Sequence, residues 1–309
     1  MPVMDAEKRR AWLKERMTGL GASDIPVLFG LSSWKSPSSL WLEKTGLQEP
    51  LDEMSEPAEW GLRLEDAIAA KFGEETGRLV PDGDPHEIAR HPDVPILMAT
   101  IDRAQVLVEG CVRPTFDVPG EVGVLELKTA AFQKADEWED GEPPLVYQVQ
   151  LQAQLLVTGR AFGSLAVLIG GQRFLWVDVP AHPEFQRRIV QEARAFWESV
   201  ETHNPPPVDG SEATREAIRR AFPQEQRAEY VELPPEAVQW DEERQRAIDA
   251  IKSWEAHKLH AENQIRAAIG DAAGGVLPNG VSYSLKLQQK RAYTVAASET
   301  RVLRRKAGK

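Results

Sequence analysis

Hydrophobic and charged residues alternate in GVLELKTA, residues 123–130. Side chains on a strand point to opposite faces in turn, so Val124, Glu126 and Lys128 share one face and two leucines share the other. The apolar neighbours predict a strand that is not simply exposed to solvent. Water alone therefore does not explain why a carboxylate and an ammonium group lie two residues apart on one face of this strand.

Apolar residues at helical spacing predict helices on both sides of a block of short strands. Ser36 followed by Pro37 predicts one helix start, and Ser23 is expected to cap another. Gly77 is expected to end the longest of the early helices. The predicted helices cover residues 6–17, 24–29, 36–45, 57–76, 146–158 and 183–201, and the predicted strands cover 94–102, 103–110, 123–130, 164–171 and 173–180.

Three consecutive prolines in HNPPPVDG, residues 203–210, predict a boundary because prolines cannot continue a helix. We therefore expect an α/β domain over 1–207 and a C-terminal extension over 208–309. The extension is predicted to hold a long helix and then a hairpin at VLPNGVSYSLKL. Six residues of that helix lie near heptad spacing: Ile248, Ile251, Lys258, Glu262, Ile265 and Ile269.

The composition is that of a soluble globular protein, with 42% hydrophobic and 28% charged residues in a chain of 309. The charged N-terminus does not resemble a signal peptide, and no apolar run approaches the roughly 18 residues of a membrane span. A cytoplasmic protein without membrane contact is therefore expected. The single cysteine, Cys111, excludes an internal disulfide and a cysteine-ligated cluster within one chain, so a metal would need oxygen or histidine ligands.

The net charge of −11 argues against nonspecific binding to nucleic acid, although the charge is unevenly distributed. Residues 286–309 carry one acid, Glu299, and eight basic residues. Two interpretations remain open for this tail, a solvated segment and a DNA contact. The basic residues are Lys286, Lys290, Arg291, Arg301, Arg304, Arg305, Lys306 and Lys309.

A second acid lies at the end of a preceding predicted strand. Asp102 follows the apolar run PILMATI, and together with Glu126 it can chelate Mg²⁺, which prefers oxygen ligands. Lys128 can hold an attacking water and stabilise developing negative charge. The alternative is a surface ion pair beside a turn aspartate, which is a common arrangement.

Two polar residues share helical faces with apolar ones. Glu65 shares a face with Ile68 and Phe72, and Gln150 shares a face with Val146 and others, so both side chains are expected to point inward. A carboxylate on an apolar face needs a cationic partner. Either residue can instead be a polar core residue whose hydrogen bonds are satisfied.

The order WGLRLED, ATID, VLELK and YQVQLQAQ resembles the PD-(D/E)XK nucleases, and specifically the phage-type alkaline exonucleases of the YqaJ-like viral recombinase group. The block GLGASDIPVLFGLSSWKSPSSLWLEKTG is similar to that group's opening block. The resemblance covers about residues 12–200, and it departs from the motif only in Ile101, which replaces a proline that is not a ligand. It implies a central mixed sheet flanked by helices, and Mg²⁺-dependent digestion of duplex DNA from the 5′ end.

The resemblance also implies roles for individual residues. Arg16 and Ser23 match the residues that bind DNA phosphate, and a helix N-terminus at Ser23 would itself favour an anion. Mn²⁺ is expected to substitute for Mg²⁺. The remaining matches are Asp102 and Glu126 as metal ligands, Glu65 and the carbonyl of Leu127 completing the metal site, Lys128 as the catalytic lysine, and Gln150 beside it.

The implied partners are double-stranded DNA ends and a single-strand annealing protein that receives the 3′ strand. A ring of three copies, and a bacterial host with a phage or prophage gene, are also implied. Two alternatives remain, another PD-(D/E)XK nuclease of the restriction or RecB-like type, and a noncatalytic scaffold that binds DNA ends. The cluster-containing RecB-like nucleases are disfavoured because the chain has one cysteine.

Overall fold

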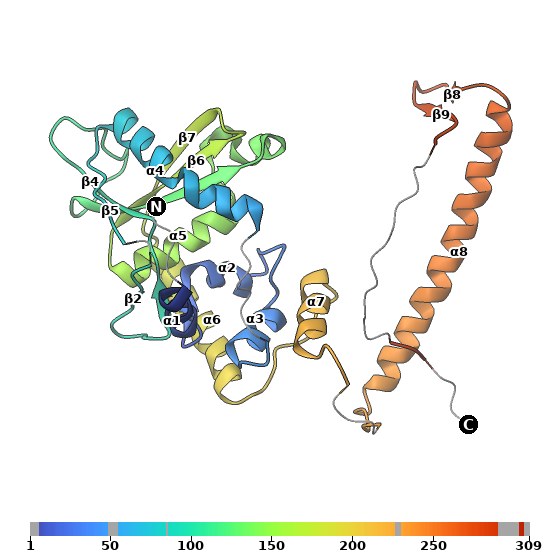
Figure 1. Cartoon of the computed structure of the whole chain (residues 1–309), viewed down its shortest axis with the longest axis horizontal. Helices are drawn as coiled ribbons and strands as arrows, with labels where there is room; N and C mark the ends of the chain where they lie inside the picture. Colours follow the sequence, from blue (N-terminus) through green and yellow to red (C-terminus); the bar gives the residue numbers. More distant parts are fainter. Residues whose placement is uncertain (1–5, 49–54, 85, 226–229, 290–302, 306–309) are drawn as a thin grey trace. The chain divides into compact units, whose positions relative to one another are not determined.

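A four-stranded mixed sheet in the order β4-β5-β6-β7 lies at the centre of the N-terminal part of the chain (Figure 1). The computed structural model describes residues 6–48, 55–84, 86–225, 230–289 and 303–305. The strands are β4 (Arg103–Val106), β5 (Val122–Ala130), β6 (Phe162–Ile169) and β7 (Arg173–Pro180). The β5–β6 pair is parallel and the other two pairs are antiparallel, so the expected mixed sheet is confirmed.

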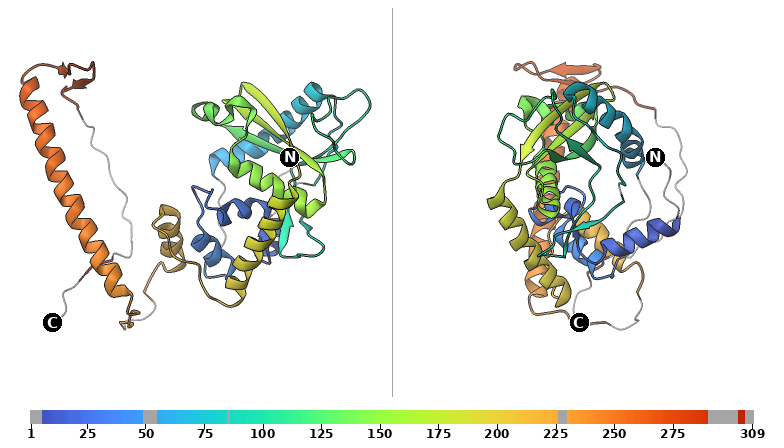
Figure 2. Two further views of the ribbon diagram at one scale, coloured as in Figure 1. Left: turned by 180° about the vertical axis from the view of Figure 1, so that it is seen from behind. Right: turned by 90° about the vertical axis from the view of Figure 1, so that its left-hand side faces the viewer.

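Two helices cover opposite faces of this sheet (Figures 1 and 2). Helix α4 (Glu56–Thr76) packs on Leu125 and Leu127, whereas α5 (Leu145–Thr158) packs on Val124. Each fully buried leucine contributes about 2 kcal/mol to folding through the hydrophobic effect. The predicted alternation of β5 is therefore confirmed, and Glu126 and Lys128 lie on the α5 side. A 3₁₀ segment, η2 (Phe132–Gly141), connects β5 to α5.

A smaller sheet holds the N-terminal loop next to the strand that leads to Asp102. Its order is β1-β3-β2, and β1 runs parallel to β3. The surrounding core includes the fully buried Leu20, Ile25, Leu97 and Ile189. The elements here are α1 (Ala6–Arg16), β1 (Leu20–Gly21), η1 (Ala22–Asp24), α2 (Ile25–Leu28), α3 (Pro37–Lys44), β2 (Ala89–Arg90), β3 (Leu97–Ala99) and α6 (Pro183–Glu201).

The predicted helix ends are confirmed in two places and wrong in one. Ser36 caps α3 by accepting the N–H of Ser39, and Gly77 ends α4 with a left-handed φ of 68°. Ser23, however, lies within η1 and does not cap α2. The residue before α2 is Asp24, whose carboxylate accepts the N–H of Gly21 and so folds the loop into a tight turn before the helix begins.

The N-terminal compact unit extends past the prolines. It comprises Met1–Pro223, and it includes α7 (Glu212–Ala221), an element that the sequence did not predict. The hydroxyl groups of Thr214 and Ser36 lie 2.6 Å apart, and Ala217 is buried. The prolines end a helix, but they do not prevent the next segment from packing on α3. The structure therefore moves the boundary between compact units from Pro207 to Pro223.

The second compact unit, Gln224–Lys309, contains the predicted long helix and hairpin. They are α8 (Ala237–Ile269), β8 (Gly274–Val276) and β9 (Ser282–Ser284). Most of the basic tail lies outside the described residues, but Arg305 forms an ion pair with Asp241 at 2.9 Å. Among the described residues, no helix is long and apolar enough to cross a membrane.

Candidate active site at the edge of the central sheet

The site lies beside the part of β5 that extends past its pairing with β4. The first β4 residue, Arg103, pairs with Leu125, so β5 has no β4 partner from residue 126 onward. Here the carboxylate of Asp102 accepts the N–H of Leu127 at 2.8 Å. A strand residue directs its N–H and its C=O to the same edge, and therefore the Leu127 carbonyl also faces the Asp102 side.

Glu126 is the most enclosed charged group of the site, with 1% of its surface exposed. Its Oε1 accepts hydrogen bonds from Lys128 Nζ and Gln150 Nε2, both at 2.5 Å. Its Oε2 accepts one from Gln154 Nε2 at 2.6 Å. The prediction that the Gln150 amide points inward is thus confirmed. These bonds hold the carboxylate in one orientation.

Glu65 reaches the same site from α4. It is buried, and in the described part of the chain its Oε2 has no hydrogen-bond partner. Burial raises the pKa of Glu65 to about 7, against the opposing charge of Arg103 and with a further contribution from Glu126. Glu65 therefore takes up a proton near neutral pH when no cation is bound nearby.

Neighbouring charges also shift the pKa of Asp102 and of Lys128. Burial, followed by the charge of Glu126, raises the pKa of Asp102 well above its usual value. Burial alone would lower the pKa of Lys128, but the charges of Glu126 and Asp102 raise it above its usual value. Lys128 is therefore a permanent ammonium group.

The donor set of this edge fits a hard divalent cation. Across the ranges that the structure describes, no three acidic, histidine or cysteine side chains converge into a preformed ligand cluster. The available donors are nevertheless all oxygen atoms, and within the described residues one buried carboxylate oxygen of Glu65 has no partner. Burial, with a further contribution from the charge of Glu126, raises the pKa of Glu65 and of Asp102. A cation held by Glu65, Asp102, Glu126 and the Leu127 carbonyl would remove each of these penalties.

The structure also brings together the two residues expected to bind phosphate. Arg16 Nη2 donates to Ser23 Oγ at 3.1 Å, and the Arg16 guanidinium lies 4.7 Å from the centre of the Trp12 ring. A small cavity of about 30 Å³ is lined by Arg16, Ser23, Thr100 and Gln150 among others. Gln150, which also bonds Glu126, therefore lines the same cavity as Arg16 and Ser23.

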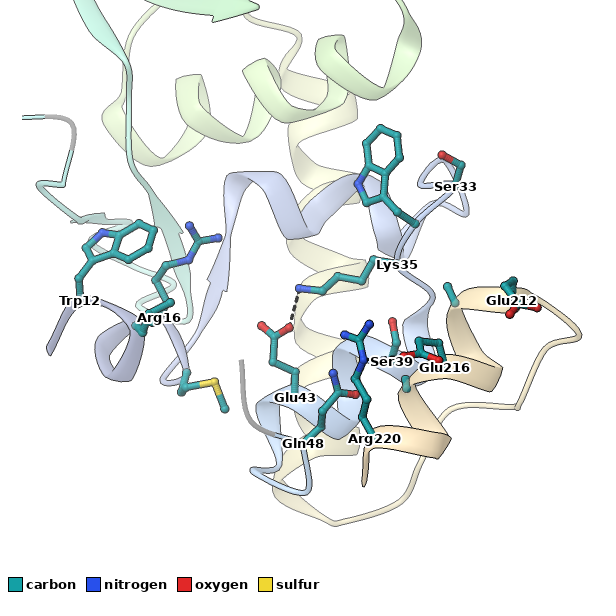
Figure 3. Close-up of a pocket in the computed structure, with 15 residues that line it drawn as sticks. Trp12, Arg16, Ser33, Lys35, Ser39, Glu43, Gln48, Glu212, Glu216 and Arg220 are labelled. Atoms are coloured by element: carbon teal, nitrogen blue, oxygen red, sulfur yellow. Dashed lines mark hydrogen bonds and ion pairs between the residues drawn. The ribbon is translucent and has the colours of Figure 1, made fainter. Parts of the chain in front are cut away.

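A buried charge network supports this loop. Lys44 Nζ lies 3.0 Å from Asp24 Oδ2 and donates to the backbone carbonyl of Arg16 at 2.8 Å. Burial would raise the pKa of Asp24, but the charges of Lys35 and Lys44 hold it well below its usual value. Lys35 also pairs with Glu43 at 2.8 Å inside a larger cavity of about 580 Å³ (Figure 3). The network fixes the position of the Arg16 backbone.

Several residues of the site were not among those predicted from the sequence. Gln154 lies one helical turn after Gln150, so the same helical spacing could have revealed it. Tyr147 lies under Lys128, with Nζ 5.1 Å from the ring centre, and has no comparable signal. Asp24 and Lys44 are twenty residues apart in the sequence, and their pairing becomes visible only in three dimensions.

A solved structure with this fold belongs to an alkaline exonuclease. The complex of LHK-Exo from Laribacter hongkongensis with dAMP is similar at a TM-score of 0.50 and 18% identity, over 63% of this chain and 93% of that chain. The fold is thus that of an alkaline exonuclease.

The sequence comparisons define the family. The YqaJ-like viral recombinase domain matches residues 11–161. The uncharacterized protein YqaJ of Bacillus subtilis (strain 168) is 32% identical over 274 residues, covering 88% of this chain and 81% of that protein. The chain belongs to the YqaJ-like viral recombinase family. Because residues 1–223 cannot supply 88% of the chain, the likeness to YqaJ includes part of the second unit.

Proposed function

We propose that this protein is a Mg²⁺-dependent exonuclease that digests linear duplex DNA from its 5′ ends, with Mn²⁺ able to replace Mg²⁺. One observation carries the proposal. Asp102, Glu126 and Lys128 meet at an open edge of β5, and the adjoining cavity is lined by Arg16 and Ser23. Acidic groups suited to a cation therefore adjoin a basic group suited to a phosphate.

The residues of the chain divide the chemistry between them. Lys128, as an ammonium group, orients a water molecule and stabilises negative charge that develops on the scissile phosphate. Gln150 holds Glu126 in place and borders the path toward Arg16. A cation held by Glu65, Asp102, Glu126 and Leu127 supplies Lewis-acid activation of the water and the phosphate when bound.

The proposed direction of digestion rests on Arg16 and Ser23. A guanidinium group binds a phosphate through two N–H donors, and a serine hydroxyl adds a third. Arg16 and Ser23 can therefore hold a terminal 5′ phosphate while the next phosphodiester bond lies at Lys128. A 5′ hydroxyl end gives Arg16 no charged partner, and its digestion should be slower.

The family supports a role in recombination. Digestion of one strand from each 5′ end leaves a 3′ single strand, which is the substrate of a single-strand annealing protein. We take this annealing protein as the partner and a ring of three copies as the assembly, both from the family resemblance. Light scattering of the purified protein tests the ring, and co-elution with the annealing protein tests the partner.

A labelled-duplex assay tests the proposed activity. Linear duplexes labelled at either end, with and without a 5′ phosphate, should lose the 5′ label first, and only when Mg²⁺ is present. Arg16→Ala should reduce the preference for phosphorylated ends, whereas the control Arg187→Ala, an exposed residue of α6, should not. Full activity in excess EDTA would exclude the mechanism. Equal loss on both kinds of end would make Arg16 structural.

A further inference from the structure

Gln154 bridges the two segments that carry the predicted metal ligands. It is fully buried on α5, and its Nε2 donates both to Glu126 Oε2 at 2.6 Å and to the Thr100 carbonyl at 3.1 Å. Turning the amide over would place its oxygen against these two acceptors. The amide orientation is therefore determined by its surroundings. Thr100 precedes Asp102 by two residues, so one amide links the Asp102 segment to Glu126.

The hydrogen bonds of Glu126 distinguish its two carboxylate oxygens. Each carboxylate oxygen has about two acceptor positions. Oε1 uses both, for Lys128 and Gln150, whereas Oε2 accepts only the bond from Gln154 among the described residues. Oε2 is thus the oxygen with an acceptor position left for a cation.

Only one of the two polar side-chain atoms of Gln154 forms hydrogen bonds within the described residues. Its Oε1 is buried and, within the described residues, lacks a hydrogen-bond partner. A buried acceptor without a partner destabilises the fold. Gln152, two residues earlier, differs in this respect. Its Nε2 donates to the Pro180 carbonyl at 2.7 Å and its Oε1 accepts the N–H of His182 at 2.9 Å.

We propose that Gln154 is a positioning residue that sets the spacing of Asp102 and Glu126 and presents Glu126 Oε2 to the divalent cation. This inference rests on the proposed function. Gln154 acts through Glu126 and does not itself touch the substrate. Gln150 bonds the other oxygen of the same carboxylate, so the two glutamines together fix its rotation.

Cation binding to the full chain without DNA tests the proposal. Mn²⁺ titration followed by electron paramagnetic resonance should show affinity weakened about 10- to 100-fold in Gln154→Met, as is typical when a residue supporting a metal ligand is lost. The matched control Gln152→Met removes a buried glutamine from the same helix. It should lower the melting temperature and leave Mn²⁺ affinity at the wild-type value.

A kinetic measurement separates positioning from chemistry. Gln154→Met should need more Mg²⁺ for half-maximal cleavage but regain most of the wild-type kcat at saturating Mg²⁺. If this variant does not fold, Gln154→Asn keeps an amide that is too short to reach both partners, and it should show the same loss of affinity.

Three results separate the possible failures. Wild-type Mn²⁺ affinity in the Gln154 variants would overturn the inference, and so would an equal loss of affinity in Gln152→Met. If the wild-type protein itself neither binds Mn²⁺ nor digests DNA, the proposed function fails. If the wild type does both while the Gln154 variants match it, only the positioning role fails.

Discussion

Helices α5 and α8 are both long, yet they are buried to opposite extents. Seven of the 14 residues of α5 are buried, whereas none of the 33 residues of α8 is. Helix α5 packs between the central sheet and the N-terminal core, and it carries two of the polar groups that bond Glu126. Helix α8 is supported by local ion pairs such as Arg266 with Glu262 at 2.9 Å.

The difference shows where the protein can hold a reactive group rigidly. A buried polar side chain keeps one orientation only if packing and hydrogen bonds both constrain it, and α5 provides both. Exposed ion pairs like those of α8 contribute little, because solvent screens the charges and both side chains lose conformational freedom. We therefore place the chemistry entirely in the first unit.

The largest expected effect is on catalysis. Asp102→Asn, Glu126→Gln and Lys128→Met should each lower kcat/KM for duplex digestion about a thousandfold, because each removes charge from one cooperating group. Matching substitutions in α8, Glu262→Gln and Lys258→Met, should leave it unchanged. Circular dichroism checks folding. Near-normal turnover in a first-unit variant would contradict the assignment of the site.

Core substitutions give the next largest effect. Leu151→Ala in α5, at a fully buried position, should cost about 2–5 kcal/mol of unfolding free energy. Leu259→Ala in α8, at a residue that is 55% exposed, should cost less than about 0.5 kcal/mol. Urea denaturation measures both. Comparable costs would mean that α8 is covered in solution by a partner or a second copy.

The pH dependence of stability should differ between the metal-free and metal-bound protein. The pKa of Glu65 rises from 4.5 unfolded to about 7 folded, so the folded state binds the proton more tightly. The proton on Glu65 adds at most about 3 kcal/mol to the free energy of unfolding. This stabilisation is fully present below pH 4.5 and is lost as the pH rises through 7.

Glu65→Gln should remove this loss, because the glutamine does not ionise. Mg²⁺ should reduce the loss in the wild type, and Mg²⁺ affinity should increase over the same pH range. Thermal denaturation with EDTA or Mg²⁺ between pH 5 and 8 checks this, with Glu262→Gln as the exposed control. A wild-type stability that rises through pH 7 without metal would show that Glu65 is not held in a proton-favouring site.

The smallest expected effect comes from removing the second unit. A chain shortened to residues 1–223 should cleave short duplexes as the full chain does, because the site lies wholly within that compact unit. A chain ending at residue 207 also loses α7, including the buried Thr214 and Ala217, and should melt at a lower temperature. If the 1–223 chain is folded but inactive, the second unit contributes to the active site.

Local signals predicted much of this architecture. The two-residue period of β5 placed Glu126 and Lys128 on one face, and Ser36 with Pro37 marked the start of α3. The helical spacing of Gln150 indicated an inward amide. In each case the determining interactions are close in the sequence, so the pattern of residue types is sufficient.

Interactions between distant residues could not be predicted in this way. The sequence suggested Ser23 as a helix cap, but Asp24 accepts the Gly21 N–H and pairs with Lys44, which places Ser23 within η1. The position of α7 depends on Thr214 meeting Ser36 across the fold. The unpaired edge of β5 after Leu125 depends on where β4 begins, at Arg103, which the sequence alone did not define.

The position of the bound cation tests the central claim most directly. Crystals of the protein soaked in Mn²⁺ should show one strong anomalous-scattering peak bounded by the carboxylates of Asp102 and Glu126 and the Leu127 carbonyl. In crystals of Glu126→Gln, soaked identically, that peak should be absent or much weaker. An unchanged peak in the variant, or Mn²⁺ bound elsewhere while this edge of β5 stays empty, would contradict a metal-dependent active site here.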